Sequence, residues 1–196
     1  MAKILVAIPT FETVSSETFK SIWDLEKGNN TLDFECVKGY DCARARNEIC
    51  TIGRERGYEY ILMVDSDVVI PKDALIRMLE YDCGLVIGCC PRKNTGEGRI
   101  EIYKPGTFSF TDYYTYDTLP LDPRVEIKGG GFACALIKTD ILNWIQYPYF
   151  KYITYEDDTS LSEDLYFCLQ IHKAGFKIEA DTRVRCGHLA RYFQYR

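Results

Sequence analysis

The chain has 196 residues, of which 46 per cent are hydrophobic and 27 per cent are charged. A chain of this size can bury a core large enough to fold without disulfides, so we expect one domain. The net charge of −5 at pH 7 argues against a general nucleic-acid-binding protein, which would carry a basic face. No stretch approaches the roughly 20 apolar residues of a membrane span. The nine cysteines show no disulfide framework, which predicts reduced, mostly buried thiols in a cytoplasmic protein.

Short apolar runs alternate with helical patterns over the first 90 residues. Strands are predicted at 3–8, 33–38, 61–67 and 85–88, and helices begin after Ser15 or Ser16, after Asp41 and at Pro71. This alternation is typical of a three-layer α/β/α domain around a mostly parallel sheet. Helical spacing predicts that the first helix buries Phe19, Ile22 and Trp23.

The second half of the chain has a different texture. Glycine, proline and aromatic residues alternate between Cys89 and Arg124, which predicts hairpins and loops in a small antiparallel subregion. A further strand is expected at 132–137, then a short helix, a longer helix that begins at residues 162–164, and a late strand at 177–180. The longer helix is expected to place Leu165, Cys168, Leu169 and His172 on one side.

Two carboxylates, Asp65 and Asp67, follow the apolar run Tyr60–Val64. Residues i and i+2 of a strand face the same way, so both can meet one divalent cation, or one can meet the cation and the other a ribose. Open α/β sheets bind ligands at this edge. By itself the pair also fits a cap for the next helix or a phosphatase nucleophile.

Glu163 and Asp164 begin the predicted late helix, where the positive end of the helix dipole favours ionised carboxylates. Such a carboxylate can act as a general base near neutral pH, although acids are ordinary in a first helical turn. His188, in a C-terminal loop, is a candidate third metal ligand beside carboxylates.

Basic and amide side chains are expected near the carboxyl ends of the strands. Arg44, Arg46 and Asn47 lie in the first two turns of the second helix, and Arg92 and Lys93 follow the fourth strand. Guanidinium and ammonium groups there can neutralise a diphosphate, although a solvated basic helix face would read the same way. The glycines at 129–131 would let a substrate approach the backbone closely, or form a flexible turn.

In their joint order these pieces resemble the GT-A family of nucleotide-sugar glycosyltransferases, close to its family-2-like branch. The resemblance covers nearly the whole chain, 1–196, as one domain, with a nucleotide-binding half (1–93) and an acceptor-binding half (94–196). The residues that carry it are 6–10, 45–47, 61–67, 88–93, 130–132, 136–137, 162–165, 175–178 and His188. The Cys- and Tyr-rich texture is also similar to the N-terminal glycosyltransferase domain of a chlorella-virus capsid-glycan enzyme, which would work in the host cytoplasm. The chain is short for the family, so the resemblance also allows that it is one domain of a longer enzyme.

The resemblance implies a donor such as a UDP-sugar, a glycan or glycoprotein acceptor, and Mn²⁺ or Mg²⁺ as cofactor. Asp67 would bind the metal, Asp65 the ribose or the metal, and His188 would complete the metal site. Asp164, with Glu163 beside it, would deprotonate the acceptor hydroxyl, which favours inversion at the anomeric carbon. The resemblance also implies residues that contact the nucleotide-sugar (Pro9, Thr10, Arg46, Asn47, Ser66 and Lys93) and residues that border the acceptor (Gly130 and Gly131).

Two other functions stay open at this point. A haloacid-dehalogenase-type phosphatase would use Asp65 as its nucleophile, but that motif normally lies on the first strand of its domain. A non-catalytic module with a transferase-like fold would bind a nucleotide or glycan without chemistry.

Overall fold

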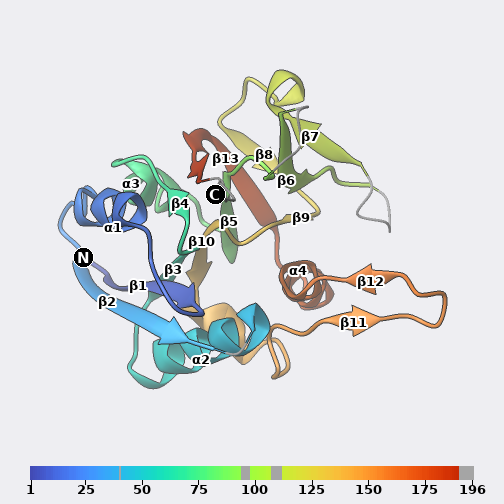
Figure 1. Cartoon of the computed structure of the whole chain (residues 1–196), viewed down its shortest axis with the longest axis horizontal. Helices are drawn as coiled ribbons and strands as arrows, with labels where there is room; N and C mark the ends of the chain where they lie inside the picture. The colour runs from blue at the N-terminus through green and yellow to red at the C-terminus, as the bar shows by residue number, and fades with distance from the viewer. Residues whose placement is uncertain (40, 94–97, 107–111, 190–196) are drawn as a thin grey trace, which may run out of the picture.

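The computed structural model describes residues 1–39, 41–93, 98–106 and 112–189. Its centre is a seven-stranded sheet in which five strands run in one direction, so the expected mostly parallel sheet is confirmed. The reversed strands β10 and β8 are antiparallel to their neighbours. Across the sheet (Figure 1) the order is β2 (Thr31–Lys38), β1 (Lys3–Thr10), β3 (Tyr60–Val64), β10 (Cys134–Lys138), β5 (Leu85–Cys89), β13 (Ile178–Arg185) and β8 (Arg124–Glu126).

Helices cover both faces of the sheet and complete the expected three layers. Successive strand residues point to opposite faces, so Ile4 and Leu62 join one core while Leu5 and Ile61 join the other. The first core packs under α1 (Ser16–Trp23) and α3 (Ala74–Met78), and the second under α2 (Cys42–Glu55), the 3₁₀ helix η2 (Thr139–Asn143) and α4 (Glu163–Lys173) (Figure 1). None of the helices in the described ranges is both long and apolar enough to cross a membrane.

Two of the predicted helix starts are confirmed by their capping bonds. The Ser15 hydroxyl accepts a hydrogen bond from the Thr18 amide, and the Asp41 carboxylate accepts one from the Arg44 amide, which satisfies amides that a first helical turn leaves without a partner. The third helix begins at Ala74 rather than at Pro71, after a turn.

The predicted inner face of α1 was right at Ile22 but wrong at Phe19 and Trp23. Trp23 is 79% exposed and Phe19 is 49% exposed, whereas the small polar side chain of Thr18 is fully buried beside Ile22. Phe19 instead packs against Trp23 and against Phe34 of the edge strand β2. Phe19 and Trp23 do lie one helical turn apart, but they form a surface cluster, because their rings pack on each other and on Phe34 rather than on the core.

The predicted inner side of α4 was also rotated. Phe167, Cys168 and Ile171 are buried, but Leu165 is only half-buried and His172 is exposed. The aromatic ring of Phe167 stacks on that of Phe150, which turns this side of the helix toward the core.

Shorter strands build the side of the molecule next to the sheet. The expected antiparallel subregion is a three-stranded sheet of β7 (Tyr113–Thr115), β6 (Arg99–Tyr103) and β9 (Gly129–Gly130). The 3₁₀ helix η1 (Tyr116–Thr118) follows β7 directly. A hairpin of β11 (Ile153–Thr154) and β12 (Ser160–Leu161) extends from α4 (Figure 1). The boundary expected between residues 93 and 94 adjoins positions 94–97, which lie outside the described residues.

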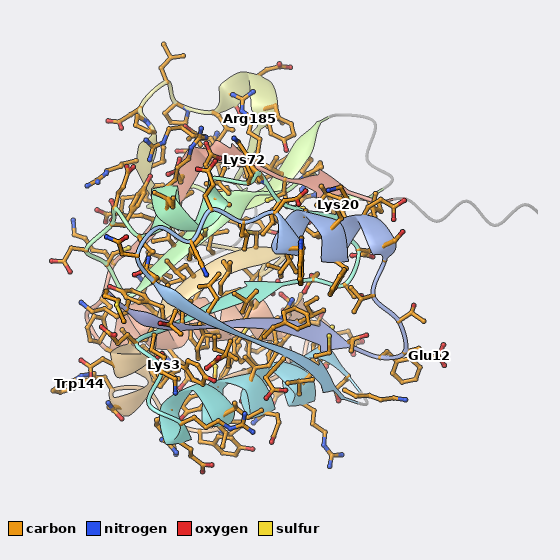
Figure 2. The ribbon with its side chains drawn as sticks, turned by 90° about the vertical axis from the view of Figure 1, so that its left-hand side faces the viewer. Lys3, Glu12, Lys20, Lys72, Trp144 and Arg185 are labelled. Carbon is orange, nitrogen blue, oxygen red and sulfur yellow. The ribbon has the colours of Figure 1, made fainter. Side chains whose placement is uncertain are left out.

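The carboxyl ends of the parallel strands define one side of the molecule. Lys3 at the start of β1 and Glu12 just after its end lie on opposite sides in Figure 2. The candidate functional residues lie after β1, β3 and β5, on the side marked by Glu12.

Candidate active site

The segment Asp65–Asp67 is a turn between β3 and β4 (Val68–Val69), not the continuous strand that the apolar run predicted. The Val68 amide donates to the carbonyl of Asp65 and closes the turn. Three longer-range backbone bonds hold it: from Asp65 to the Ala133 carbonyl, from Ser15 to the Ser66 carbonyl, and from Leu189 to the Asp67 carbonyl. The strand argument for the direction of the two carboxylates therefore fails, but both side chains still line one hollow.

Strand pairing carries His188 to Asp67, across 121 positions of the sequence. β14 (Gly187–His188) pairs antiparallel with β4, so that His188 lies opposite Val68. Its ring atom Nδ1 lies 2.8 Å from the carbonyl oxygen of Pro91, and its Nε2 lies 3.4 Å from Oδ1 of Asp67. The ring is thus held from one side and presents Nε2 to the carboxylate.

Two side chains, Lys93 and His188, contact the carboxylate of Asp67. Lys93 contacts the second carboxylate oxygen, Oδ2. The hydrogen bond with His188, together with the contact from Lys93, lowers the pKa of Asp67 to about 2 although burial opposes it. The same bond with Asp67 raises the pKa of His188. In this arrangement the Lys93 ammonium and the His188 ring both contact one carboxylate.

The predicted metal set of Asp65, Asp67 and His188 is only partly assembled. Within the ranges that the structure describes, no three His, Cys, Asp or Glu side chains converge as a ready metal site. Asp67 and His188 do converge, and two ligands that each lie about 2.1 Å from a cation can be up to about 4.2 Å apart. A histidine whose other ring nitrogen is held by a carbonyl is also the usual arrangement for a metal ligand. The spacing of Asp67 and His188 is therefore compatible with one divalent cation.

Asp65 is bonded to Arg46. Arg46 is 3% exposed, and its terminal nitrogens lie 2.9 Å from Oδ1 of Asp65 and 2.6 Å from Oε1 of Glu163. Its guanidinium also lies over the rings of Phe132 and Phe150. Burial raises the pKa of both carboxylic acids, and Arg46 counteracts it.

These contacts bear on two of the predicted roles, and both side chains also line the second hollow described below. Arg46 was expected to contact the nucleotide-sugar, but its terminal nitrogens are occupied by carboxylates inside the protein. Glu163 was expected beside the general base, but it is 6% exposed and paired with Arg46. Sequence position placed both near the site and could not tell that they neutralise each other.

Asn47 does not fit its predicted contact with the nucleotide-sugar either. Its side-chain amide donates to the carbonyls of Ala43 and Phe150 and accepts from the Phe150 amide. The side chain is buried, so it joins α2 to the segment before the β11–β12 hairpin rather than facing a ligand.

A first hollow has a volume of about 370 Å³ and is bounded by the ends of β1, β2 and β3. We call it the donor hollow, after the role that sequence analysis predicted for residues in its lining. It contains predicted residues from four separate segments, and it also contains Phe11 and Asp41, which sequence analysis did not name as site residues. Phe11 is 61% exposed, so its ring is accessible for stacking. The predicted residues in the lining are Pro9, Thr10, Asp65, Ser66, Asp67, Lys93 and His188.

A second hollow of about 330 Å³ adjoins the first and shares Cys42, Asp65, Lys93 and His188 with it. We call it the acceptor hollow, after the role that sequence analysis predicted for Gly131 and Asp164 in its lining. Asp164 lies in its lining at the start of α4. The Oδ1 atom of Asp164 accepts hydrogen bonds from the Leu165 amide and the Ser162 hydroxyl. Among the described residues no hydrogen-bond donor reaches its Oδ2 atom, which is therefore open to a substrate.

The two predicted acceptor-side glycines differ in position. Gly131 lines the acceptor hollow. Gly130 is buried in β9, where a β-carbon would lie 2.6 Å from the carbonyl oxygen of Glu101. Gly130 therefore lets two strands approach closely, and the prediction that it borders the acceptor does not fit its position.

No protein-family model and no curated protein sequence matches the chain. Among solved structures, A197 from STIV is similar with a TM-score of 0.68 and 18% identity, over 96% of this chain and 86% of that chain. The catalytic domain of Drosophila β1,4-galactosyltransferase 7, solved in complex with xylobiose, is similar with a TM-score of 0.59 and 14% identity, over 97% of this chain and 72% of that chain. At such low identities the likeness shows the fold alone, which is a GT-A-like α/β fold.

Proposed function

We propose that the protein is a metal-dependent glycosyltransferase that moves a sugar from a nucleoside-diphosphate sugar, with a UDP-sugar favoured, to a hydroxyl of a glycan or glycoprotein. The observation that carries this proposal is the pair of adjoining hollows, which share Asp65, Lys93 and His188. A transferase needs two substrates in neighbouring spaces, with their reacting atoms at the boundary. The fold shared with a galactosyltransferase catalytic domain supports the same class of reaction.

The donor hollow has the groups that a nucleoside diphosphate requires. Phe11 offers an exposed ring beside Pro9 and Thr10 for the base. Lys93 is a cation for the diphosphate once its contact with Asp67 is exchanged. Asp67 and His188 would hold Mn²⁺ or Mg²⁺, and the bound metal would neutralise charge on the leaving diphosphate.

Asp164 is the proposed general base. Its Oδ2 atom faces the acceptor hollow, where it can accept the proton of a bound hydroxyl. The acceptor oxygen would bond to the anomeric carbon while the bond from that carbon to the diphosphate oxygen breaks, and Asp164 would take the hydroxyl proton. A single displacement of this kind inverts the anomeric centre.

The two alternatives receive less support from the site. A phosphatase nucleophile at Asp65 has to present a free carboxylate to phosphorus, whereas Oδ1 of Asp65 is bonded to Arg46. A covalent phosphoenzyme trapped at Asp65 would favour this alternative. A binding module would have no need of an open carboxylate at Asp164, and metal-independent binding without turnover would favour it.

Thermal stability with UDP- and GDP-sugars in the presence of Mn²⁺ tests donor binding, because a ligand that binds only the folded state raises the melting temperature. Asp67→Ala should abolish the Mn²⁺-dependent shift, and Asp33→Ala on β2 is its control. An unchanged shift in Asp67→Ala would refute the metal role.

Release of the nucleoside diphosphate in the presence of acceptors tests the base. Asp164→Asn should keep the donor-induced shift but lower turnover by about 10²- to 10⁴-fold. The control is Asp140→Asn. Asp140 lies at the start of η2, which follows the end of β10 beside Tyr60, at the amino end of β3. Turnover at the wild-type rate in Asp164→Asn would end the role of Asp164 as base.

A further inference from the structure

The acceptor hollow contains a carboxylate, that of Glu101, that the proposed reaction does not use. Glu101, on β6, lies in the lining together with Gly131 and Asp164. A methyl group added at Gly131 would lie 3.0 Å from Cβ of Glu101 and 3.6 Å from Oδ2 of Asp164. The two acidic side chains therefore border the same small space, which exists because position 131 has no side chain.

Backbone and side-chain bonds hold Glu101 at this place. The Gly131 amide donates to the Glu101 carbonyl over 2.8 Å, and the Glu101 amide donates to the Cys90 carbonyl. Its carboxylate lies 3.1 Å from Nε of Arg92 through Oε1 and accepts from the Tyr103 hydroxyl at 3.0 Å through Oε2. A carboxylate has about four lone-pair positions, so each oxygen can accept another hydrogen bond.

We infer that Glu101 binds the acceptor, by accepting a hydrogen bond from a hydroxyl next to the one that attacks. This inference rests on the proposed function and deepens it. Asp164 meets the attacking hydroxyl, and Glu101 meets its neighbour across Gly131. Two acceptors of hydrogen bonds on one side of a narrow space select a molecule with at least two neighbouring hydroxyls, which is the pattern of a pyranose ring. The acceptor class is therefore a sugar rather than the single hydroxyl of a serine or threonine side chain.

The side chain of Glu101 also fits this role by its accessibility. It is 30% exposed although it is paired with Arg92, so a substrate can reach the carboxylate without breaking into the core. Arg92 and Tyr103 fix its direction in advance, which reduces the entropy lost when an acceptor binds.

Steady-state release of UDP from a UDP-sugar, with Mn²⁺, tests the inference. The acceptor probes are methyl β-D-glucopyranoside, methyl β-D-galactopyranoside and methyl β-D-xylopyranoside, each with its monodeoxy derivatives, and the single-hydroxyl probes are 1-propanol and N-acetyl-L-serine amide. Glu101→Gln should raise the KM of the best pyranoside about ten- to a hundredfold, because a hydrogen bond to a charged group is lost, and should leave the KM of the donor within about twofold. The monodeoxy probe that lacks the neighbouring hydroxyl should lose affinity in the wild type and lose nothing further in Glu101→Gln.

Two further variants keep the result interpretable. Glu35→Gln is the matched control, since Glu35 is also a strand glutamate paired with an arginine, Arg56, at similar exposure. Gly131→Ala fills the space between the carboxylates, and its backbone is not in the left-handed region, so it should also raise the acceptor KM while donor binding persists.

The outcomes separate the inference from the function on which it rests. Turnover by the wild type with an acceptor KM that Glu101→Gln does not change, or equal use of pyranosides and single-hydroxyl probes, overturns the inference and leaves the transferase standing. A wild type that neither binds nor turns over any nucleotide-sugar overturns both.

Discussion

Arg46 gives the sharpest test of how the site is held together. Replacing it by methionine keeps most of the side-chain volume but removes the charge that Asp65 and Glu163 share. At 2.6 to 2.9 Å one such pair has a gross attraction of about 6 kcal/mol at an effective dielectric constant of about 20, which the loss of hydration largely offsets. Removal of one partner from a buried pair costs about 3–5 kcal/mol, because the remaining charge is buried without compensation. Arg46→Met should therefore lose about that much free energy of unfolding.

The pH dependence of this loss identifies its cause. Burial already raises the pKa of Asp65 and of Glu163, and Arg46 counteracts it, so both pKa values should rise further in Arg46→Met. A carboxyl group with a raised pKa in the folded state binds more protons there than in the unfolded state, so stability falls as the pH rises through that pKa. The free energy of unfolding that Arg46→Met loses relative to wild type should be small near pH 4 and should grow toward pH 7.

Urea unfolding of wild type and variant at pH 4 to 7 measures this difference. Arg56→Met, which removes the cation of an exposed pair with Glu35, should stay close to wild type at every pH. If Arg46→Met does not fold at pH 7, Arg46→Lys keeps the charge without the two-pronged geometry and should show a smaller deficit. A deficit below about 1 kcal/mol in Arg46→Met, or one that is the same at pH 4 and pH 7, would refute the reasoning.

Two further predictions concern Asn47 and His188. Asn47→Ala should lose about 1–3 kcal/mol of unfolding free energy, measured in urea, because the buried amide and carbonyl groups of Phe150 lose their partner. The thermal shift caused by a UDP-sugar should persist in this variant. Normal stability with lost donor binding would show that Asn47 contacts the ligand. Mn²⁺ binding, followed by calorimetry without substrate, should weaken as the pH falls through the pKa of His188, because a metal needs the neutral imidazole. Since that pKa is raised, the weakening should begin above the pH expected for an ordinary histidine. This pH dependence of Mn²⁺ binding should remain in His172→Gln and vanish in His188→Gln. A pH-independent affinity in the wild type would contradict the metal role of His188.

The order of strands and helices could be predicted because it is written in local patterns. Apolar runs such as 4–8 and 61–64 are buried on both faces, as central strands are. Ser15 and Asp41 marked helix starts because their side chains bond the next turn of the same helix. These signals act over a few residues, so one sequence is enough to recognise them.

Contacts between distant segments could not be predicted in the same way. The motif around Arg46 and Asn47 indicated the right end of the sheet, but whether these side chains face a ligand or the interior depends on Glu163 and Phe150, more than 100 positions away. Glu101 was missed for the same reason. Its strand looked like an ordinary alternating run, and only pairing with Gly131 brings it to Asp164.

Strand direction explains how the two hollows come to adjoin. The run 132–137 was predicted as a strand, but its apolar pattern is the same for both directions. β10 is antiparallel between β3 and β5, and Cys134 lies opposite Val64. Its first residue therefore lies at the carboxyl end of β3, and the segment before it, Gly131–Ala133, is delivered directly to Asp65, whose amide bonds the Ala133 carbonyl. A parallel strand in this position would deliver its last residue there and would place Gly131 at the opposite end of the sheet. The reversed strand thus joins the donor side to the acceptor side, and β14, antiparallel to β4, adds His188 by the same means.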